Sequence, residues 1–324
     1  MQIRWNLATP IPAARKSLVW LHSIRYHGRQ PQQYQRTLMN IPTVLSFFDK
    51  DTKSYSYVVA DEQAGACAII DSVLDFDIKS GRTSTDGADA LIAAVKERGW
   101  RTEWVLETHA HADHFTAAAY VKAQLGGRLG IGANIPTVQE AFRAIYNLGS
   151  DFASDGRQFD QMFADGEEFR IGGLSARVMA TPGHTPACIT YVIGDAAFIG
   201  DTMFAPDYGT ARCDFPGGDA RQLYRSIQRI LALPPETRLY QCHDYPPDGR
   251  EPTPCSTVAQ QRADNVHLAG KTEDAFVAMR EARDKTLDMP ALLLPAVQVN
   301  IRAGTLPAPE GNGISYLKIP VNRF

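Results

Sequence analysis

Three of the eight histidines in the chain lie within six residues of one another, next to an aspartate. They occur in the segment Thr108-His109-Ala110-His111-Ala112-Asp113-His114. In a loop between a strand and a helix, side chains at positions i and i+2 can face one cavity, and the carboxylate and third imidazole follow one turn later. Imidazole and carboxylate are natural ligands of zinc, iron and manganese, whereas a set without thiolates disfavours a structural zinc finger. The segment predicts a metal site. The alternative interpretation is a chance cluster of surface histidines that caps a helix.

Three further potential ligands occur at the ends of strand-like segments. They are His184 after residues 174–180, Asp201 after residues 195–200, and His243 after residues 239–242. Functional side chains concentrate in loops that a rigid sheet positions, so the repeated pattern favours a metal site over a chance cluster.

The elements that must position these residues alternate between strand and helix from residue 43 onwards. Period-two and apolar segments predict strands, and apolar residues at helical spacing predict helices. The expected strands are residues 55–60, 66–71, 104–108, 174–180, 188–193, 195–200 and 239–242. The expected helices are residues 88–98, about 115–124, 220–231, 256–264 and 273–287, followed by an apolar, proline-marked segment at 291–304.

The HxHxDH segment, followed by Gly183-His184-Thr185-Pro186, Gly200-Asp201-Thr202 and Cys242-His243-Asp244, resembles the metallo-β-lactamase superfamily over about residues 43–250. The resemblance implies an α/β fold, a four-layer αββα sandwich with the metal site at one edge of two packed sheets. We expect residues 39–255 to form this domain and residues 256–324 to form a short C-terminal helical cap packed on it. The fold alone does not choose a reaction, because the superfamily contains hydrolases, oxidoreductases and nucleases.

The loops between the last ligands are similar to those of the persulfide dioxygenases, most closely the bacterial β-lactamase-hydrolase-like branch. The similar segments are residues 208–218, 243–245, 276–279 and 295–302. This resemblance implies an enzyme with one Fe(II) per chain, held by His109, His184 and Asp201, and a substrate bound by Arg212 and Tyr245. Two histidines and one carboxylate leave positions open on iron for O2 and a substrate sulfur.

The remaining polar residues are then expected to surround the site without binding iron, by lining a vacated second metal position or orienting the ligands. They are His111, Asp113, His114 and His243. Arg212 has an alternative interpretation as a surface ion pair with Asp214, and Tyr245 one as a half-buried aromatic. Asp244 could orient a ligand or be a simple loop residue.

The implied reaction oxidises the outer sulfur of glutathione persulfide with O2 to sulfite and releases glutathione, which would serve sulfide detoxification. The main alternative is a dinuclear zinc hydrolase of the glyoxalase II or lactonase type. It would place His109, His111 and His184 at one Zn(II), and Asp113, His114 and His243 at the other, with Asp201 bridging them. Residues 211–215 and the short cap favour the dioxygenase. A sulfur sensor without catalysis is disfavoured by the complete ligand set.

The amino-acid composition limits the expected binding partners and the expected cellular compartment of the protein. A net charge of -3 and 44% hydrophobic residues predict a soluble protein without nucleic-acid partners, and no apolar run has the length that a membrane requires. Five scattered cysteines without a CxxC pair favour a reducing compartment, which we expect to be the bacterial cytoplasm. The family resemblance suggests a homodimer.

Residues 1–38 differ from the rest, with six Lys or Arg residues and no Asp or Glu. We interpret them as a basic N-terminal extension that is disordered or lies before a true start at Met39. If the extension is instead a transit peptide, the expected location is the mitochondrial matrix.

Overall fold

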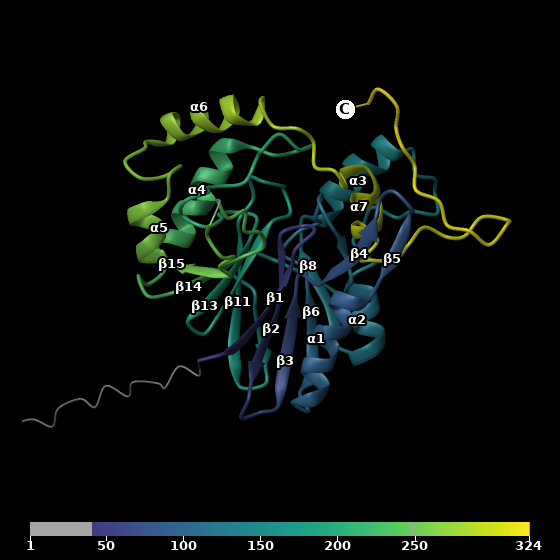
Figure 1. Ribbon diagram of the computed structural model, residues 1–324, viewed down its shortest axis with the longest axis horizontal. Coiled ribbons are helices and arrows are strands. Elements are labelled where there is room, and N and C mark those ends of the chain that lie inside the picture. The colour runs from purple at the N-terminus through teal and green to yellow at the C-terminus, as the bar shows by residue number, and fades with distance from the viewer. Residues whose placement is uncertain (1–40, 248, 324) are drawn as a thin grey trace, which may run out of the picture. The chain divides into compact units, whose positions relative to one another are not determined.

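The computed structural model describes residues 41–247 and 249–323, in which two six-stranded β-sheets pack face to face between helices (Figure 1). The extension expected at residues 1–38 lies outside the described residues. The strand order of the first sheet is β1-β2-β3-β6-β8-β9, and that of the second is β10-β11-β12-β13-β14-β15. Each sheet therefore comes from one continuous part of the chain.

The first sheet begins with antiparallel strands and continues with parallel ones. Its strands are β1 (Thr43–Asp49), β2 (Ser54–Asp61), β3 (Ala66–Ile70), β6 (Arg101–Leu106), β8 (Arg128–Gly132) and β9 (Gln161–Phe163). The pairs β3–β6, β6–β8 and β8–β9 are parallel, which requires helical crossovers between most of these strands. All residues of β2 and β3 are buried, as expected for strands covered on both faces.

The second sheet is antiparallel except for one pair. Its strands are β10 (Glu168–Ile171), β11 (Leu174–Ala180), β12 (Ile189–Ile193), β13 (Ala196–Gly200), β14 (Arg238–Gln241) and β15 (Cys255–Thr257). The parallel pair β13–β14 is joined through helix α4 (Ala220–Leu231). A small third sheet contains β4 (Val73–Asp77), β5 (Arg82–Ser84) and β7 (Phe115–Thr116).

Three apolar clusters separate the layers. Between the sheets, Tyr57 and Leu106 of the first pack with Tyr191 and Phe198 of the second. Helices α1 (Asp86–Glu97), α2 (Ala118–Leu125) and α3 (Ile135–Tyr146) bury their apolar faces on the outer side of the first sheet. Helix α4 does the same on the second sheet. The predicted four-layer αββα arrangement is confirmed.

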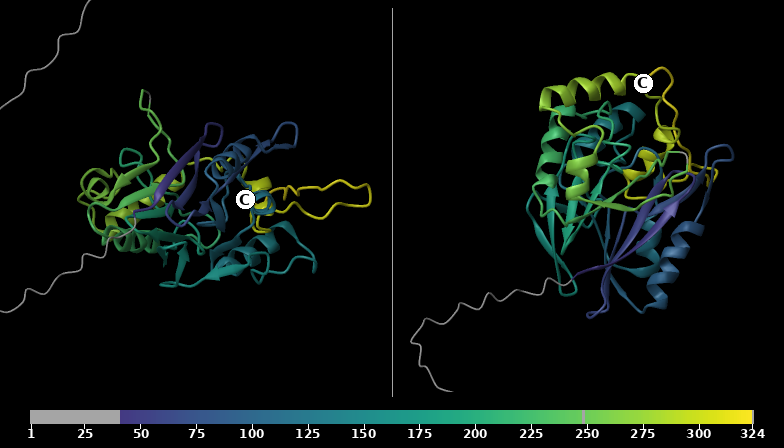
Figure 2. Two further views of the ribbon diagram at one scale, coloured as in Figure 1. Left: turned by 90° about the horizontal axis from the view of Figure 1, so that it is seen from below. Right: turned by 60° about the vertical axis from the view of Figure 1, so that its left-hand side comes forward.

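The C-terminal part contributes the helical cap and one more strand. Residues 255–257 extend the second sheet as β15, where a helix was expected to begin at residue 256. Helices α5 (Val258–Asp264) and α6 (Glu273–Asp284) follow, and α6 packs beside α4 (Figure 2). Residues 293–300, predicted only as part of an apolar segment, form α7 (Leu293–Asn300) against α3 and β7. In the described part of the chain, no helix is long and apolar enough to cross a membrane.

Candidate metal centre

The predicted ligands meet at one edge of the two sheets, where several strands end. His109 follows β6 in the first sheet, whereas His184, Asp201 and His243 follow β11, β13 and β14 in the second. The four side chains are almost fully buried, with exposures between 0% and 5%. The two halves of the sandwich therefore share one polar site.

His109, His184 and Asp201 form the first group of potential ligands, because one atom from each lies within 4.8 Å of the others. The Nε2 atom of His109 lies 3.9 Å from Oδ2 of Asp201, and Nε2 of His184 lies 3.7 Å from the same oxygen. These separations exceed hydrogen-bond length. They suit donor atoms that face a common ion.

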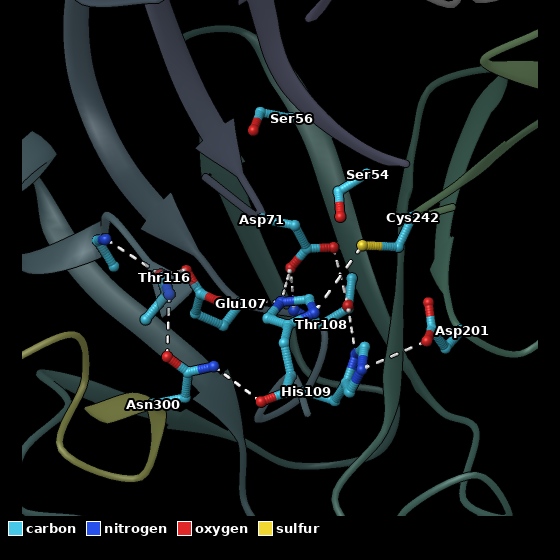
Figure 3. Close-up of polar contacts among 12 residues, drawn as sticks. Ser54, Ser56, Asp71, Glu107, Thr108, His109, Thr116, Asp201, Cys242 and Asn300 are labelled. Atoms are coloured by element: carbon cyan, nitrogen blue, oxygen red, sulfur yellow. Dashed lines mark hydrogen bonds and ion pairs between the residues drawn. The ribbon is translucent and has the colours of Figure 1, made fainter. Parts of the chain in front are cut away.

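Hydrogen bonds on the far side of each ring turn the Nε2 atoms inward. Nδ1 of His184 donates to the backbone carbonyl of Arg212 over 2.8 Å. Nδ1 of His109 lies 3.0 Å from Oγ1 of Thr108, which in turn donates to Asp71 over 2.8 Å (Figure 3). Such outer partners fix the tautomer and ring orientation of metal-binding histidines.

The inward-facing atoms lack partners of their own within the described chain. Nε2 of His109 and Oδ1 of Asp201 are buried and make no hydrogen bond. Burial, together with the surrounding imidazoles, holds the pKa of His109 well below its usual range, so the ring is neutral and keeps a free lone pair. Since buried polar atoms are costly to leave unpaired, this donor set fits a metal ion. The chain therefore has a metal cofactor site.

Asp113, His114 and His243 form a second group whose ligand atoms also lie within 4.8 Å of one another. Nδ1 of His114 donates to the carbonyl of Phe115 at 3.1 Å, and Nδ1 of His243 lies 3.2 Å from Oγ of Ser54. On the other side of the rings, Nε2 of His243 lies 3.1 Å from Oδ2 of Asp113, and Nε2 of His114 lies 3.9 Å from Sγ of Cys242. The side chains expected to line a second metal position therefore lie together, and their role stays a prediction.

His111 is oriented differently from the other four histidines of the site. Its Nε2 atom lies 3.1 Å from Oδ1 of Asp71 and 3.1 Å from Oε2 of Glu107, both nearly fully buried. Although burial lowers its pKa, Asp71 and Cys242 raise the value well above the usual range. Its Nδ1 faces Sγ of Cys242 at 3.8 Å. His111 is therefore paired with carboxylates and is absent from the groups around Asp201.

Asn300, at the end of α7, holds the loop that carries the first three histidines. Its Nδ2 donates to the carbonyls of His111 and His114, both over 2.7 Å. Its Oδ1 accepts from the backbone N–H of Thr116 over 2.9 Å (Figure 3). One buried amide therefore fixes three backbone groups of the loop.

Sequence reasoning missed several of these residues. They are Asp71, Glu107, Thr108, Cys242 and Asn300. Asp71 ends the predicted strand 66–71, so it followed the same strand-end pattern as the ligands and could have been found. The inward orientation of Glu107 and Asn300 depends on contacts that only the folded chain creates.

A cavity of about 380 Å³ opens from the site toward α6. Asp113, His184 and Asp201 line its inner end, and Arg212 and Tyr245 line its walls. The Tyr245 ring is stacked on His243 with centroids 5.6 Å apart. The volume lies within the range of small-molecule sites.

Arg212 lines this cavity but is also paired within the chain. Its guanidinium makes two hydrogen bonds to Asp214, at 2.6 and 2.7 Å, and one to the carbonyl of Asp288 at 2.6 Å. The ion pair considered as its alternative interpretation is therefore present, although some of its N–H groups stay free. The side chain of Asp244, for which the sequence allows two roles, accepts hydrogen bonds from Arg250 at 2.6 and 2.7 Å and from the N–H of Thr253. None of these hydrogen bonds involves a candidate ligand histidine.

His267 anchors the segment that carries Arg212. Its Nδ1 accepts from the backbone N–H of Thr210 over 3.0 Å, which requires a neutral ring. Burial, with nearby Arg280 and Arg283, lowers the pKa of His267 to about 4. The unfolded chain, with a histidine pKa of about 6.5, binds this proton more readily. This histidine therefore makes the protein less stable as the pH falls from about 6.5 toward 4.

We expect urea unfolding to report this dependence. The free energy of unfolding should fall between pH 7 and pH 5, and the fall should be smaller in His267→Gln, whose amide oxygen can accept the same bond without titrating. An equal fall in both proteins would contradict the role of His267.

Gly183 allows the loop before His184 to pass close to α4. Its φ is +143°, and a Cβ atom here would lie 2.3 Å from the Cα of Leu223. Gly183→Ala is expected to cost about 3 kcal/mol through strain and overpacking, and to weaken metal binding by displacing His184. Gly65→Ala is the matched control, because Gly65 has a φ of +59° and nothing within 4 Å. Chemical denaturation and metal titration of both variants test this, and similar losses in both would contradict it.

Comparison with known proteins agrees with this architecture. The chain matches the family model of the metallo-beta-lactamase superfamily over residues 50–243. It is 58% identical over 291 residues to the "Probable metallo-hydrolase" of Burkholderia pseudomallei strain 1710b, covering 86% of this chain and 99% of that protein. It is 54% identical over 295 residues to the "Beta-lactamase hydrolase-like protein" of Xylella fastidiosa strain Temecula1, covering 91% of this chain and 68% of that protein.

The chain is also similar, at lower sequence identity, to proteins named persulfide dioxygenase or ETHE1. The chain is 28% identical over 291 residues to the mouse "Persulfide dioxygenase ETHE1, mitochondrial", covering 89% of this chain and 98% of that protein. The crystal structure of ETHE1 from Myxococcus xanthus matches with a TM-score of 0.65 and 30% identity, covering 81% of this chain and 100% of that chain. The resemblances predicted from the sequence are thereby confirmed. The chain belongs to the metallo-β-lactamase superfamily.

Proposed function

We propose that the protein is a persulfide dioxygenase that oxidises glutathione persulfide with O2 to sulfite and glutathione. It would use one Fe(II) per chain, held by His109, His184 and Asp201. The proposal draws support from the similarity to proteins named persulfide dioxygenase and ETHE1. The more similar relatives carry hydrolase names, so the argument depends on the site itself.

The observation that carries the proposal is the orientation of His111. In a dinuclear site we would expect this ring to join His109 and His184 at one ion. Instead neither ring nitrogen of His111 belongs to the group formed by His109, His184 and Asp201. Its Nε2 is paired with Asp71 and Glu107, each at 3.1 Å, and its Nδ1 faces Sγ of Cys242 at 3.8 Å. Two imidazoles and one carboxylate remain for the ion, which is the donor set of non-haem Fe(II) oxygenases.

An Fe(II) held by these three residues would supply the chemistry that binds O2 and a persulfide sulfur and oxidises that sulfur. The protein's contribution is to hold the ligands and shape the cavity. Thr108 and the Arg212 carbonyl orient the two rings, at 3.0 and 2.8 Å. Buried Phe204 and Phe215 line the cavity and limit access of water. In the overall reaction the two oxygens of O2 and one from water become the oxygens of sulfite.

We also propose that Arg212 and Tyr245 contact the glutathione part of the substrate. Both line the cavity, and Arg212 keeps donors that its bonds to Asp214 and Asp288 do not use. Tyr245 offers an aromatic face beside His243. In this arrangement Asp214 orients the guanidinium toward the substrate. The bacterial cytoplasm and a homodimer stay predictions.

A dinuclear zinc hydrolase is the second candidate function, and one observation favours it. Asp113, His114 and His243 gather as a complete second ligand group beside Asp201. Oδ1 of Asp201 lies 3.5 Å from Nε2 of His243, so this carboxylate faces both groups. If two zinc ions were bound, a bridging hydroxide would be the nucleophile.

Elemental analysis and turnover together separate the two candidates. Protein purified without oxygen should contain about one iron per chain. It should consume O2 and form sulfite when glutathione persulfide is added. Two zinc ions per chain, thioester hydrolysis and no O2 uptake would contradict the dioxygenase and support the hydrolase.

A further inference from the structure

A buried ion pair on α6 lies outside the ligand set. Arg280 is 1% exposed and Asp284 is 6% exposed. They are one helical turn apart, and Nε of Arg280 donates to Oδ1 of Asp284 over 2.9 Å. Removing two charges from water costs about as much as their attraction returns, so a buried pair is weak evidence of added stability. The other hydrogen bonds of Arg280 and Asp284 indicate the structural role of the pair.

Both partners also bind the backbone of one loop. Nη1 of Arg280 donates to the carbonyl of Thr210 over 2.9 Å, and Oδ2 of Asp284 accepts from the N–H of Cys213 over 2.9 Å. These two backbone groups lie three residues apart. The ion pair therefore clamps residues 210–213 at both ends.

The clamped loop contains the group that orients His184. The carbonyl of Arg212 lies between the two clamped positions and accepts from Nδ1 of His184 over 2.8 Å. The side chain of Arg212 also donates to the carbonyl of Asp288, beyond the end of α6. Movement of α6 relative to the second sheet would therefore move this carbonyl.

The other imidazole of the first group does not depend on α6. Nδ1 of His109 is held by Thr108, the preceding residue, and by Asp71 at the end of β3. His184 instead depends on a loop that forms only an isolated bridge, between Met203 and Thr210. Of the two imidazoles, His184 is the one whose orientation depends on α6.

We propose that Arg280 and Asp284 are positioning residues, which fix residues 210–213 so that the Arg212 carbonyl aims Nε2 of His184 into the metal site. This rests on the ligand assignment made under the proposed function, and it adds α6 to the elements that set metal affinity. The pair acts through its two hydrogen bonds to the backbone, so the charges of Arg280 and Asp284 alone would not hold the loop. Apolar residues of similar size would fill the space but release the loop.

The experiment replaces the pair with Arg280→Met and Asp284→Leu together. Apolar replacement of the ion pair itself often leaves stability unchanged, but the carbonyl of Thr210 and the N–H of Cys213 lose their partners. We therefore expect a folded protein whose melting temperature is lower than that of the parent. Loss of the clamp should weaken binding of Co²⁺ to the metal-free protein by about tenfold, the lower end for groups that orient ligands. The visible spectrum of the Co²⁺ form should change as well, because one imidazole is no longer held.

Arg221→Met provides the matched control. Arg221 is 45% exposed and pairs with Glu273 and Asp274 at the start of the same helix, without contacting the loop. Its Co²⁺ affinity and spectrum should equal those of the parent. If the double variant does not fold, Asp284→Ala is measured instead, since it removes the acceptor of the Cys213 N–H. Unchanged Co²⁺ affinity and spectrum in a folded variant of either kind would overturn the proposal.

His184→Ala separates this inference from the proposed function. Wild-type Co²⁺ affinity in His184→Ala would contradict the assignment of His184 as a metal ligand. It would also contradict the positioning role of Arg280 and Asp284. A parent protein that binds metal but forms no sulfite would contradict the dioxygenase alone. In that case the affinity of the double variant still decides whether α6 positions His184.

Discussion

Replacing His109, His184 or Asp201 with alanine is expected to reduce the metal content from about one ion per chain to near zero. Each contributes one of the three donor atoms that lie within 4.8 Å of one another, and two remaining donors hold an ion weakly. Turnover should disappear with the metal. His114→Ala is expected to keep most of the metal, because His114 belongs to the second group.

Metal content is measured by elemental analysis on protein purified without oxygen, with circular dichroism to verify that each variant is folded. Equal metal loss in His114→Ala would point to two ions that share Asp201. The comparison is informative because His109 and His114 are similarly buried, at 1% and 0% exposure. Burial alone therefore cannot explain a difference between them.

Asn300→Ala is expected to have the largest effect among the changes outside the ligand set. It leaves the carbonyls of His111 and His114 and the N–H of Thr116 without their partner. A buried polar group without a partner costs about 1–3 kcal/mol, so a loss of about 3 kcal/mol or more in unfolding free energy follows. Metal affinity should fall too, since the loop between β6 and β7 loses its anchor.

Gln298→Ala is the matched control for Asn300→Ala. Gln298 is a buried amide of the same helix, but it binds the backbone of Leu294 and Lys318 instead of the metal loop. Its loss should reduce stability and leave metal affinity unchanged. Denaturant unfolding and metal titration of both variants test the prediction. Equal metal affinity in the two variants would show that Asn300 is structural only.

The positions of the candidate ligands in the fold could be predicted because they follow from local patterns. His109, Asp201 and His243 each come within three residues of the end of a strand, and apolar strand segments are readable from the sequence. The ends of neighbouring strands meet at one edge of a sheet, so the ligands had to gather there. The αββα layers follow from the same alternation of elements.

The directions of the side chains could not be predicted in the same way. His111 has the same motif position in both proposed functions. Only the folded chain brings Asp71 and Glu107 together at its Nε2, each at 3.1 Å. Likewise, Arg212 has two interpretations until its guanidinium is seen beside Asp214. Phe115 was expected in a helix but pairs with Leu74 in the third sheet.

The ligands of the first group come from both halves of the sandwich, with His109 after β6 and Asp201 after β13. Neither half contains the full set, so the ion can bind tightly only after the two sheets have docked. It then acts as a reversible cross-link that stabilises the folded chain by mass action, by about 4 kcal/mol when free metal is a thousand times its dissociation constant. A cell that runs short of the metal would therefore lose folded protein as well as activity, and the supply of the ion would control how long each molecule survives.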